Sequence, residues 1–317
     1  MVRIGLVRRA AMGLVYGAIE GGGTKFVVAV GSGPENIIAR TRMDTRTPDL
    51  TIPDCIGFIR EASAGHALGA IGVACFGPIQ LDTAAADYGS VTNTPKPGWA
   101  HTPIVGPLQS AFGVPVGFDT DVNGAALGEW RWGAAQGCDP CVYLTVGTGI
   151  GGGAIINGYP LHGLLHPEMG HVPIPRLTWP NGEMDDYVGF CTYHGAGCFE
   201  GMAAGPAISG RLGQPGETIP DDHPIWELEA GYLAAGLASI VLALSPRRIV
   251  LGGGVMQRSD VLERTRRRLR ETLAGYVASP QITGDQTDYL VAPKYGQDAG
   301  LVGAFALAEA AYEVAKR

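Results

Sequence analysis

Apolar runs broken by glycine turns open each half of the chain. In the first half, Leu14–Ile19 and Phe26–Val30 flank the turn Gly21–Thr24, a pattern that predicts a β-hairpin. In the second half, the segment CVYLTVGTGIGGGAIING, from Cys141 to Gly158, repeats the layout of strand, turn and strand. Because further strand and helix patterns follow each hairpin, we predict two related α/β domains with a cleft between them that faces both turns.

The remaining periodicities predict further strands and helices. Short apolar runs predict strands near Ile37–Arg42 and at Ala70–Cys75, Val114–Phe118 and Arg248–Leu251. Helical spacing and capping residues predict helices that begin at Pro48 and that span Asn123–Trp132, Gly205–Leu212, Pro224–Leu244, Asp260–Tyr276 and Ala299–Ala315. Residues 172–200 show no period, which predicts an irregular loop with little hydrophobic core to order it. We expect residues 12–122 with 298–317 to form a smaller domain, and residues 123–297 a larger one.

The composition favours a folded protein and argues against two kinds of partner. Apolar residues make up 46% of the 317 residues and charged residues 17%, so disorder is not expected. The net charge is -7 and the basic run Arg264–Arg270 has helical spacing, so we expect no nucleic-acid partner. The apolar stretch Ala230–Leu244 is too short for a membrane span and predicts a buried helix, so no membrane partner is expected.

The N-terminal residues 1–11 lack the apolar core of a signal peptide. We therefore expect a cytoplasmic protein, in which these residues are a loose extension or an artefact of the assigned start codon. Reduced cysteines are expected in that compartment, so closely spaced pairs among the six cysteines indicate either a metal site or no special role.

Three glycine clusters each follow an apolar strand: Gly21–Gly23, Gly147–Gly153 and Gly252–Gly254. Glycine lets backbone N–H groups turn toward an anion and lets a phosphate approach closely, so the three turns favour a phosphate-binding protein. The second cluster also matches the dinucleotide pattern G-x-G-x-x-G, which requires a following helix. Because a strand is predicted there instead, we set aside an NAD-dependent oxidoreductase.

Three carboxylates are candidates for the chemistry of such a site, and Glu20 lies next to one of these turns in the sequence. Asp119 and Asp121 end a predicted strand two positions apart, which would place both side chains on one face. A carboxylate there suits a general base for a sugar hydroxyl, and a helix cap is the alternative role for either residue. Glu20 precedes the first turn, where it could hold Mg²⁺ through water or simply end a strand.

The spacing Cys191-x-x-His194-x-x-x-Cys198, with His171 upstream, offers two thiolates and two imidazoles. This donor set predicts a closed tetrahedral zinc site of the structural kind, with a free thiol pair and surface histidines as the alternative. The pair Cys138-x-x-Cys141 is interpreted as incidental, and Cys55 and Cys75 as small core residues.

Eight segments together are similar to the ROK family of sugar kinases and repressors, in the actin-like ATPase superfamily with its ribonuclease H-like fold. They are EGGGTK, FGP, TPKPGW, DTDVNGAALGE, TVGTGIGGG, HPEMGH, CTYHGAGCFEG and LGGGVM. The sequence most resembles the bacterial zinc-containing fructokinases of that family, from about Tyr16 onward. The resemblance implies a homodimer that phosphorylates a free hexose with ATP and Mg²⁺, with fructose the first choice. Mannose, glucose or N-acetylhexosamine kinases, and a sugar sensor without turnover, remain alternatives.

The resemblance also implies a role for each matched residue. Asp121 would be the catalytic base, and Thr120, Glu168, His171 and Glu200 would contact the sugar. Structural Zn²⁺ would bind His171, Cys191, His194 and Cys198, with the second imidazole nitrogen of His171 facing the sugar. Glu20 would hold Mg²⁺ through water. ATP would be bound by Gly22, Gly23, Thr24, Lys25, Thr148, Gly149, Pro206, Gly252, Gly253, Gly254, Val255 and Met256.

Two departures from the broader family pattern resemble the fructokinase branch. Tyr193 and His194 stand where a cysteine and a glycine are usual, so His194 would supply the missing ligand, and Thr120 stands where asparagine is frequent. Residues 1–15 are too few for the helix-turn-helix of the repressor members, so DNA binding is not expected. Sugar choice is expected to depend on wall residues, with Thr94–Trp99 as the candidate segment.

Overall fold

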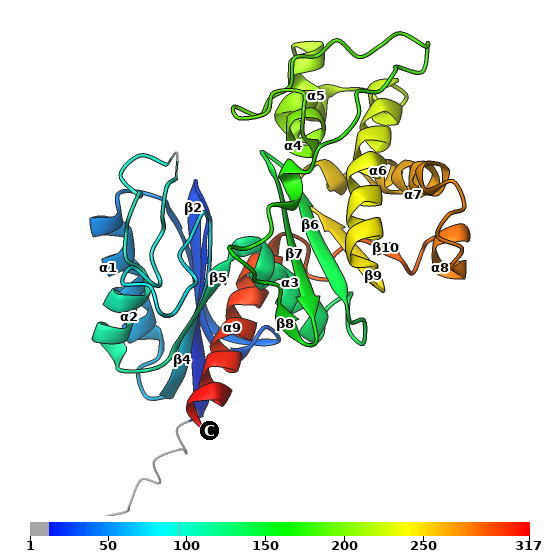
Figure 1. The fold of residues 1–317 in the computed structure, drawn as a ribbon. Helices are drawn as coiled ribbons and strands as arrows, with labels where there is room; N and C mark the ends of the chain where they lie inside the picture. Colours follow the sequence, from blue (N-terminus) through cyan, green and yellow to red (C-terminus); the bar gives the residue numbers. More distant parts are fainter. Residues whose placement is uncertain (1–12, 95) are drawn as a thin grey trace, which may run out of the picture. The chain divides into compact units, whose positions relative to one another are not determined.

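The computed structural model describes residues 13–94 and 96–317, which divide into two compact units (Figure 1). The first unit contains residues 13–121 and 301–317, and the second contains residues 122–300. Each unit is built around its own five-stranded sheet. The expectation for residues 1–11 lies outside the described residues.

The sheet of the first unit has the strand order β3-β2-β1-β4-β5. Its strands are β1 (Leu14–Gly21), β2 (Lys25–Gly33), β3 (Asn36–Asp44), β4 (Ala67–Cys75) and β5 (Val116–Thr120). The first three strands are antiparallel neighbours, whereas β1, β4 and β5 run parallel. The predicted hairpin and the other predicted strands of this unit are therefore confirmed.

Helices cover both faces of this first sheet (Figure 1). Helices α1 (Pro48–Ala62) and α2 (Val105–Phe112) lie on one face, and α9 (Ala299–Ala315) lies on the other. Helix α2 has no counterpart among the predicted elements, because eight residues that include a glycine and a proline give no clear period. Helix α1 begins at Pro48 as predicted, with the proline in its first turn.

The contact between α9 and the sheet depends on a pair of glycines. Gly72 on β4 and Gly117 on β5 are directly paired in register. A Cβ atom at Gly72 would overlap the carbonyl oxygen of Ala304, and one at Gly117 would overlap that of Leu307. Because the helix backbone touches the sheet backbone here, the helix needs small residues on that side, which its alanine-rich sequence supplies.

The sheet of the second unit has the order β10-β9-β6-β7-β8. Its strands are β6 (Cys141–Val146), β7 (Ile150–Ile156), β8 (Tyr159–Pro160), β9 (Arg248–Gly252) and β10 (Leu290–Val291). Strands β6, β9 and β10 are parallel, and β7 and β8 are antiparallel to their neighbours. The second predicted hairpin, β6–β7, is confirmed, and a strand rather than a helix follows Gly149. This arrangement excludes the dinucleotide-binding interpretation.

The helices of the second unit are α3 (Asp121–Trp132), α4 (Phe199–Ala203), α5 (Gly205–Leu212), α6 (Ile225–Leu244), α7 (Ser259–Leu273) and α8 (Pro280–Thr283). Helix α6 supplies much of the core, which includes Trp226, Tyr232 and Leu233. Among the described residues, α6 is the one helix that is long enough and apolar enough to cross a membrane. The expectation that this apolar stretch is too short for a membrane span was therefore wrong. Because 67% of the stretch is buried inside the protein, its apolar character is explained by the core, as predicted.

The segment between β8 and α4 is irregular, with one 3₁₀ turn at Met169–His171. It is fastened to α5 and α6 through Asp185, a residue that is only 1% exposed. The Asp185 carboxylate accepts hydrogen bonds from the Arg211 guanidinium at 2.8 Å and from the Tyr232 hydroxyl at 2.7 Å. The loop is irregular, as predicted, and a buried ion pair that the sequence did not indicate anchors it.

Candidate active site and metal centre

Three parallel strands in the first unit bring the first glycine turn and Asp121 to one edge of the sheet. Gly21 at the end of β1 pairs with Cys75 at the end of β4, and Cys75 pairs with Thr120 at the end of β5. Asp121 follows Thr120 directly and begins α3. Neighbouring strands are about 4.8 Å apart, so the turn and Asp121 follow strands about 10 Å from each other. Ligands of open α/β sheets typically bind at this edge.

The two aspartates near this edge have different environments. Asp119 is 2% exposed on β5, and its carboxylate accepts the backbone N–H of Thr120 at 2.8 Å. Asp121 is partly exposed and belongs to the helix. The expectation that both side chains share one strand face was wrong, because β5 ends at Thr120. Burial, followed by the charge of Asp121, raises the pKa of the neighbouring Cys75 thiol.

The first glycine turn is held in shape by the backbone and by Thr45. The Gly22 N–H donates to the carbonyl oxygen of Lys25 at 2.9 Å, and the Thr45 hydroxyl donates to the carbonyl oxygen of Gly22 at 2.7 Å. A Cβ atom at Gly23 would meet no atom within 4 Å, so this position leaves room for an anion. Glu20 lies directly before Gly21, the first residue of the turn, on β1.

The segment proposed for sugar choice contains a core residue. Trp99 is fully buried, stacks on Phe26 with ring centroids 5.3 Å apart, and donates its indole N–H to the carbonyl oxygen of Arg46 at 2.8 Å. It therefore cannot form an accessible sugar wall, whereas Pro95 lies outside the described residues.

The second and third glycine turns meet at one edge of the other sheet. Strands β6 and β9 are parallel neighbours, with Thr145 paired to Gly252. Gly253 has φ +96°, and a Cβ atom there would overlap the backbone of Val146. Only glycine fits this position, both for its left-handed backbone and for its close approach to β6. The N–H of Gly205 at the start of α5 donates to the carbonyl oxygen of Gly147 at 2.8 Å.

A cavity of about 670 Å³ opens beside these two turns, within the size range of small-molecule sites. Four of the residues predicted to bind ATP line it: Thr148, Pro206, Gly254 and Val255. Gly149, Gly252, Gly253 and Met256 are not among its lining residues. The turn residues Gly22, Gly23, Thr24 and Lys25 belong to the first unit.

Part of the cavity wall is formed by residues that are not among the predicted ATP-binding residues. Ser209, Glu217, Trp226 and Arg258 belong to this group. The Arg258 guanidinium lies 4.1 Å from the centroid of the Trp226 ring, a cation–π contact between residues 32 positions apart. A sequence signal is available only for Arg258, which follows the third glycine turn closely.

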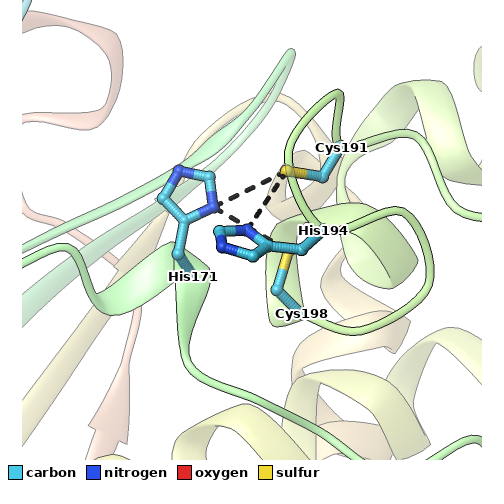
Figure 2. Close-up of side chains that lie close together, drawn as sticks. All are labelled: His171, Cys191, His194 and Cys198. Atoms are coloured by element: carbon cyan, nitrogen blue, oxygen red, sulfur yellow. Dashed lines mark hydrogen bonds between the residues drawn. The ribbon is translucent and has the colours of Figure 1, made fainter.

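The four predicted metal ligands lie together (Figure 2). One ligand atom from each of His171, Cys191, His194 and Cys198 lies within 4.8 Å of all the others. The Nδ1 atom of His171 is 3.8 Å from each cysteine sulfur, and that of His194 is 3.6 Å from the Cys191 sulfur. A tetrahedral zinc ion with ordinary bond lengths would place sulfur and nitrogen about 3.6 Å apart. The donor set and its spacing therefore fit a metal of this kind.

Local structure explains how two of these ligands are placed. Cys198 caps the N-terminus of α4, where its sulfur accepts the Gly201 N–H at 3.4 Å. His171 ends the 3₁₀ turn, and its backbone N–H donates to the carbonyl oxygen of Glu168 at 3.0 Å. The remaining two ligands come from the loop that precedes α4, so the cluster joins three stretches of the same irregular segment.

The predicted sugar contacts are only partly brought together. The Nε2 atom of His171 lies 4.0 Å from Oε1 of Glu200, so His171 has one nitrogen toward the metal ligands and one toward a carboxylate. Glu168 is adjacent in the turn, with its carboxylate 3.4 Å from Nδ1 of His166. Thr120 belongs to the first unit and is buried there.

These two sheets, their glycine turns and Asp121 define a protein with the two-domain actin-like ATPase fold. The chain belongs to the ROK family, whose family model matches residues 16–311.

Three similar proteins illustrate the relationship. A fructokinase from Zymomonas mobilis is 44% identical over 302 residues, which cover 94% of this chain and 97% of that protein. The crystal structure of a ROK hexokinase from Thermus thermophilus is 28% identical, with a TM-score of 0.75 and coverage of 96% and 100%. A ROK glucokinase from Streptomyces griseus, solved with glucose and AMPPNP, is 26% identical, with a TM-score of 0.71 and coverage of 93% and 99%.

Proposed function

We propose that this protein is an ATP-dependent fructokinase that transfers the γ-phosphoryl group of ATP to the 6-hydroxyl of fructose. The observation that carries the proposal is the position of Asp121 on the same sheet edge as the first glycine turn. A partly exposed aspartate and a backbone turn suited to phosphate thus follow strands about 10 Å apart at the same edge. Fructose is favoured over glucose because the fructokinase relative is 44% identical and the glucokinase only 26%.

The reaction assigns a step to each group. Asp121 orients the sugar hydroxyl and accepts its proton as the new O–P bond forms and the bond from the γ-phosphorus to ADP breaks. We assign ATP to the cavity beside the second and third turns. The family resemblance implies that the first turn, with Lys25, also contacts the phosphates. Magnesium would accompany the phosphates, and Glu20 would hold it through water. Thr120, Glu168, His171 and Glu200 are proposed to bind the sugar.

The metal is proposed to be a structural Zn²⁺ ion. All four ligands come from the protein, which leaves no open position for a substrate, and two thiolates with two imidazoles suit zinc. Its contribution would be to fix His171, whose second nitrogen then faces the sugar side. A homodimer completes the proposal on the basis of the family resemblance, and a cytoplasmic location on the basis of the N-terminal sequence.

The test is a coupled assay of ADP release over fructose, mannose, glucose and N-acetylhexosamines. We expect the highest kcat/KM with fructose; a faster rate with another hexose would replace the substrate, and no turnover with any hexose would refute the kinase proposal. Asp121→Asn should lower kcat by about 10²- to 10⁴-fold, whereas the matched control Asp49→Asn, on the exposed first turn of α1, should leave it unchanged. Near-normal turnover of Asp121→Asn would remove that residue from the role.

A further inference from the structure

The carboxylate of Glu200 contacts two different parts of the second unit. One oxygen, Oε2, accepts the backbone N–H of Ile150 at 3.0 Å. The other oxygen, Oε1, lies 4.0 Å from Nε2 of the metal-ligand candidate His171. Ile150 begins β7 and directly follows residues 147–149, which form the second glycine turn between β6 and β7. We propose that Glu200 is a positioning residue for this turn, which couples the nucleotide phosphates to the sugar and metal side of the site. This inference rests on the proposed kinase function.

The shape of the turn supports this role. The turn closes on itself through a hydrogen bond from the Gly147 N–H to the carbonyl oxygen of Gly149 at 2.9 Å. A Cβ atom at Gly149 would lie 2.6 Å from Oε2 of Glu200 and 3.5 Å from its Cδ. Apart from the two chain neighbours of Gly149, no other described residue has an atom within 4 Å of that position. Gly149 does not have a left-handed backbone. A side chain at this position would therefore have to displace the carboxylate of Glu200.

The other end of the connection is fixed by the metal-ligand cluster. Glu200 is the second residue of α4, and the sulfur of Cys198 caps the start of that helix. The side chain of Glu200 is 21% exposed, which limits its freedom and shields the hydrogen bond to Ile150 from water. Consecutive contacts thus connect the metal ligands, through α4 and Glu200, to the second glycine turn.

A shared carboxylate links the two substrates. A sugar hydroxyl bound at Oε1 would restrict the carboxylate, and the carboxylate in turn fixes the N–H groups that the phosphates meet. Fructose and the nucleotide should therefore raise each other's affinity by the same factor, because coupling between two binding sites is reciprocal.

Calorimetric titration with AMPPNP in the absence of sugar tests the positioning role directly. Glu200→Ala should weaken AMPPNP binding about 5- to 10-fold, as expected for the loss of one charge-assisted hydrogen bond. Glu200→Gln keeps an oxygen acceptor for the Ile150 N–H and should recover affinity to within about threefold. The comparator is Glu168→Gln, a proposed sugar contact whose carboxylate pairs with His166. It should raise the KM for fructose and leave AMPPNP affinity unchanged.

A double-mutant cycle with Gly149→Ala removes the ambiguity of a folding defect. Alone, Gly149→Ala should push Glu200 away from Ile150 and weaken AMPPNP binding as much as Glu200→Ala does. In the Glu200→Ala background the added methyl group has room, so it should change affinity less than twofold. Zinc content and melting temperature, measured on every variant, report whether each one folds.

Two results would overturn the inference: wild-type AMPPNP affinity in Glu200→Ala, or effects of Gly149→Ala and Glu200→Ala that multiply as independent changes. A failure of the proposed function has a different signature, because it leaves the wild type unable to phosphorylate any hexose. The AMPPNP titrations need no sugar, so they test the role of Glu200 in either case.

Discussion

The buried ion pair between Asp185 and Arg211 offers the sharpest test of how the irregular loop is held. The side chains are 1% and 2% exposed, and the carboxylate also accepts the Tyr232 hydroxyl. Burial by itself raises the pKa of Asp185, but hydrogen bonds from Arg211 and Tyr232 and the charge of Arg211 outweigh this, so the pKa is lowered. The pair's contribution to stability is therefore present above about pH 4 and is lost as the pH falls through the lowered pKa.

The expected cost of Asp185→Ala follows from what the change leaves behind. The Arg211 guanidinium would remain buried, with two backbone carbonyl oxygens but without the charge of Asp185. Removing one partner of a buried ion pair typically costs about 3–5 kcal/mol. For a unit of this size, each kcal/mol lowers the melting temperature by roughly 2–4 °C, so we expect a decrease of roughly 6–20 °C.

The assay is urea and thermal unfolding at pH 7, with two further variants. The surface pair Arg268–Glu271 has side chains that are 39% and 54% exposed, so Glu271→Ala should cost only about 0.5 kcal/mol. The double variant Asp185→Leu with Arg211→Met removes both charges and should cost less than the sum of the two single changes. A cost below 1 kcal/mol for Asp185→Ala, or strict additivity in the double variant, would refute the argument.

Two other perturbations give independent tests. Chelation of the metal should release zinc, expose residues 188–198 to hydrogen exchange and weaken fructose binding. Residues 176–187 should stay protected, because the Asp185 ion pair still holds them. Unchanged hydrogen exchange at residues 188–198 would contradict the metal assignment. Burial raises the pKa of Glu229 well above its ordinary value of 4.5, and its carboxylate oxygens have no hydrogen-bond partner among the described residues. Its contribution to stability is therefore full below about pH 4.5 and is lost as the pH rises toward the folded-state pKa, by at most about 1.4 kcal/mol per pH unit. Glu229→Gln should consequently gain stability relative to the wild type between pH 5 and pH 8, measured as the difference in melting temperature, and an equal difference at both pH values would rule this out.

Elements with a local signal were predictable from the sequence. Both glycine hairpins, the strands β4 and β9 and the alanine-rich α9 have patterns that are complete within about 20 residues. The metal-ligand cluster also has a local signal, because three of its four ligands lie within the eight residues Cys191–Cys198 and their chemistry is distinctive.

Features that depend on distant residues were not predictable in this way. Asp185 meets Arg211 and Tyr232, which are 26 and 47 positions away, and a buried charge leaves no mark on hydrophobic periodicity. The cavity wall at Trp226 is hidden in the same way, since a tryptophan on an apolar helix indicates a core residue. The exact end of β5 decided the environment of Asp121, and strand ends are set by pairing with β4 rather than by local propensity.

The two anchors of the irregular loop differ in kind, and this difference makes their roles separable. The metal ligands gather the end of the loop near α4, whereas the Asp185 ion pair fastens its middle to α5 and α6. Glu200 lies two residues beyond the last metal ligand, Cys198, so the second glycine turn should respond to chelation but not to Asp185→Ala at temperatures where that variant remains folded. If AMPPNP affinity fell equally after both perturbations, the loop would act as one cooperative unit. That result would contradict a specific connection from the metal through Glu200 to the second glycine turn.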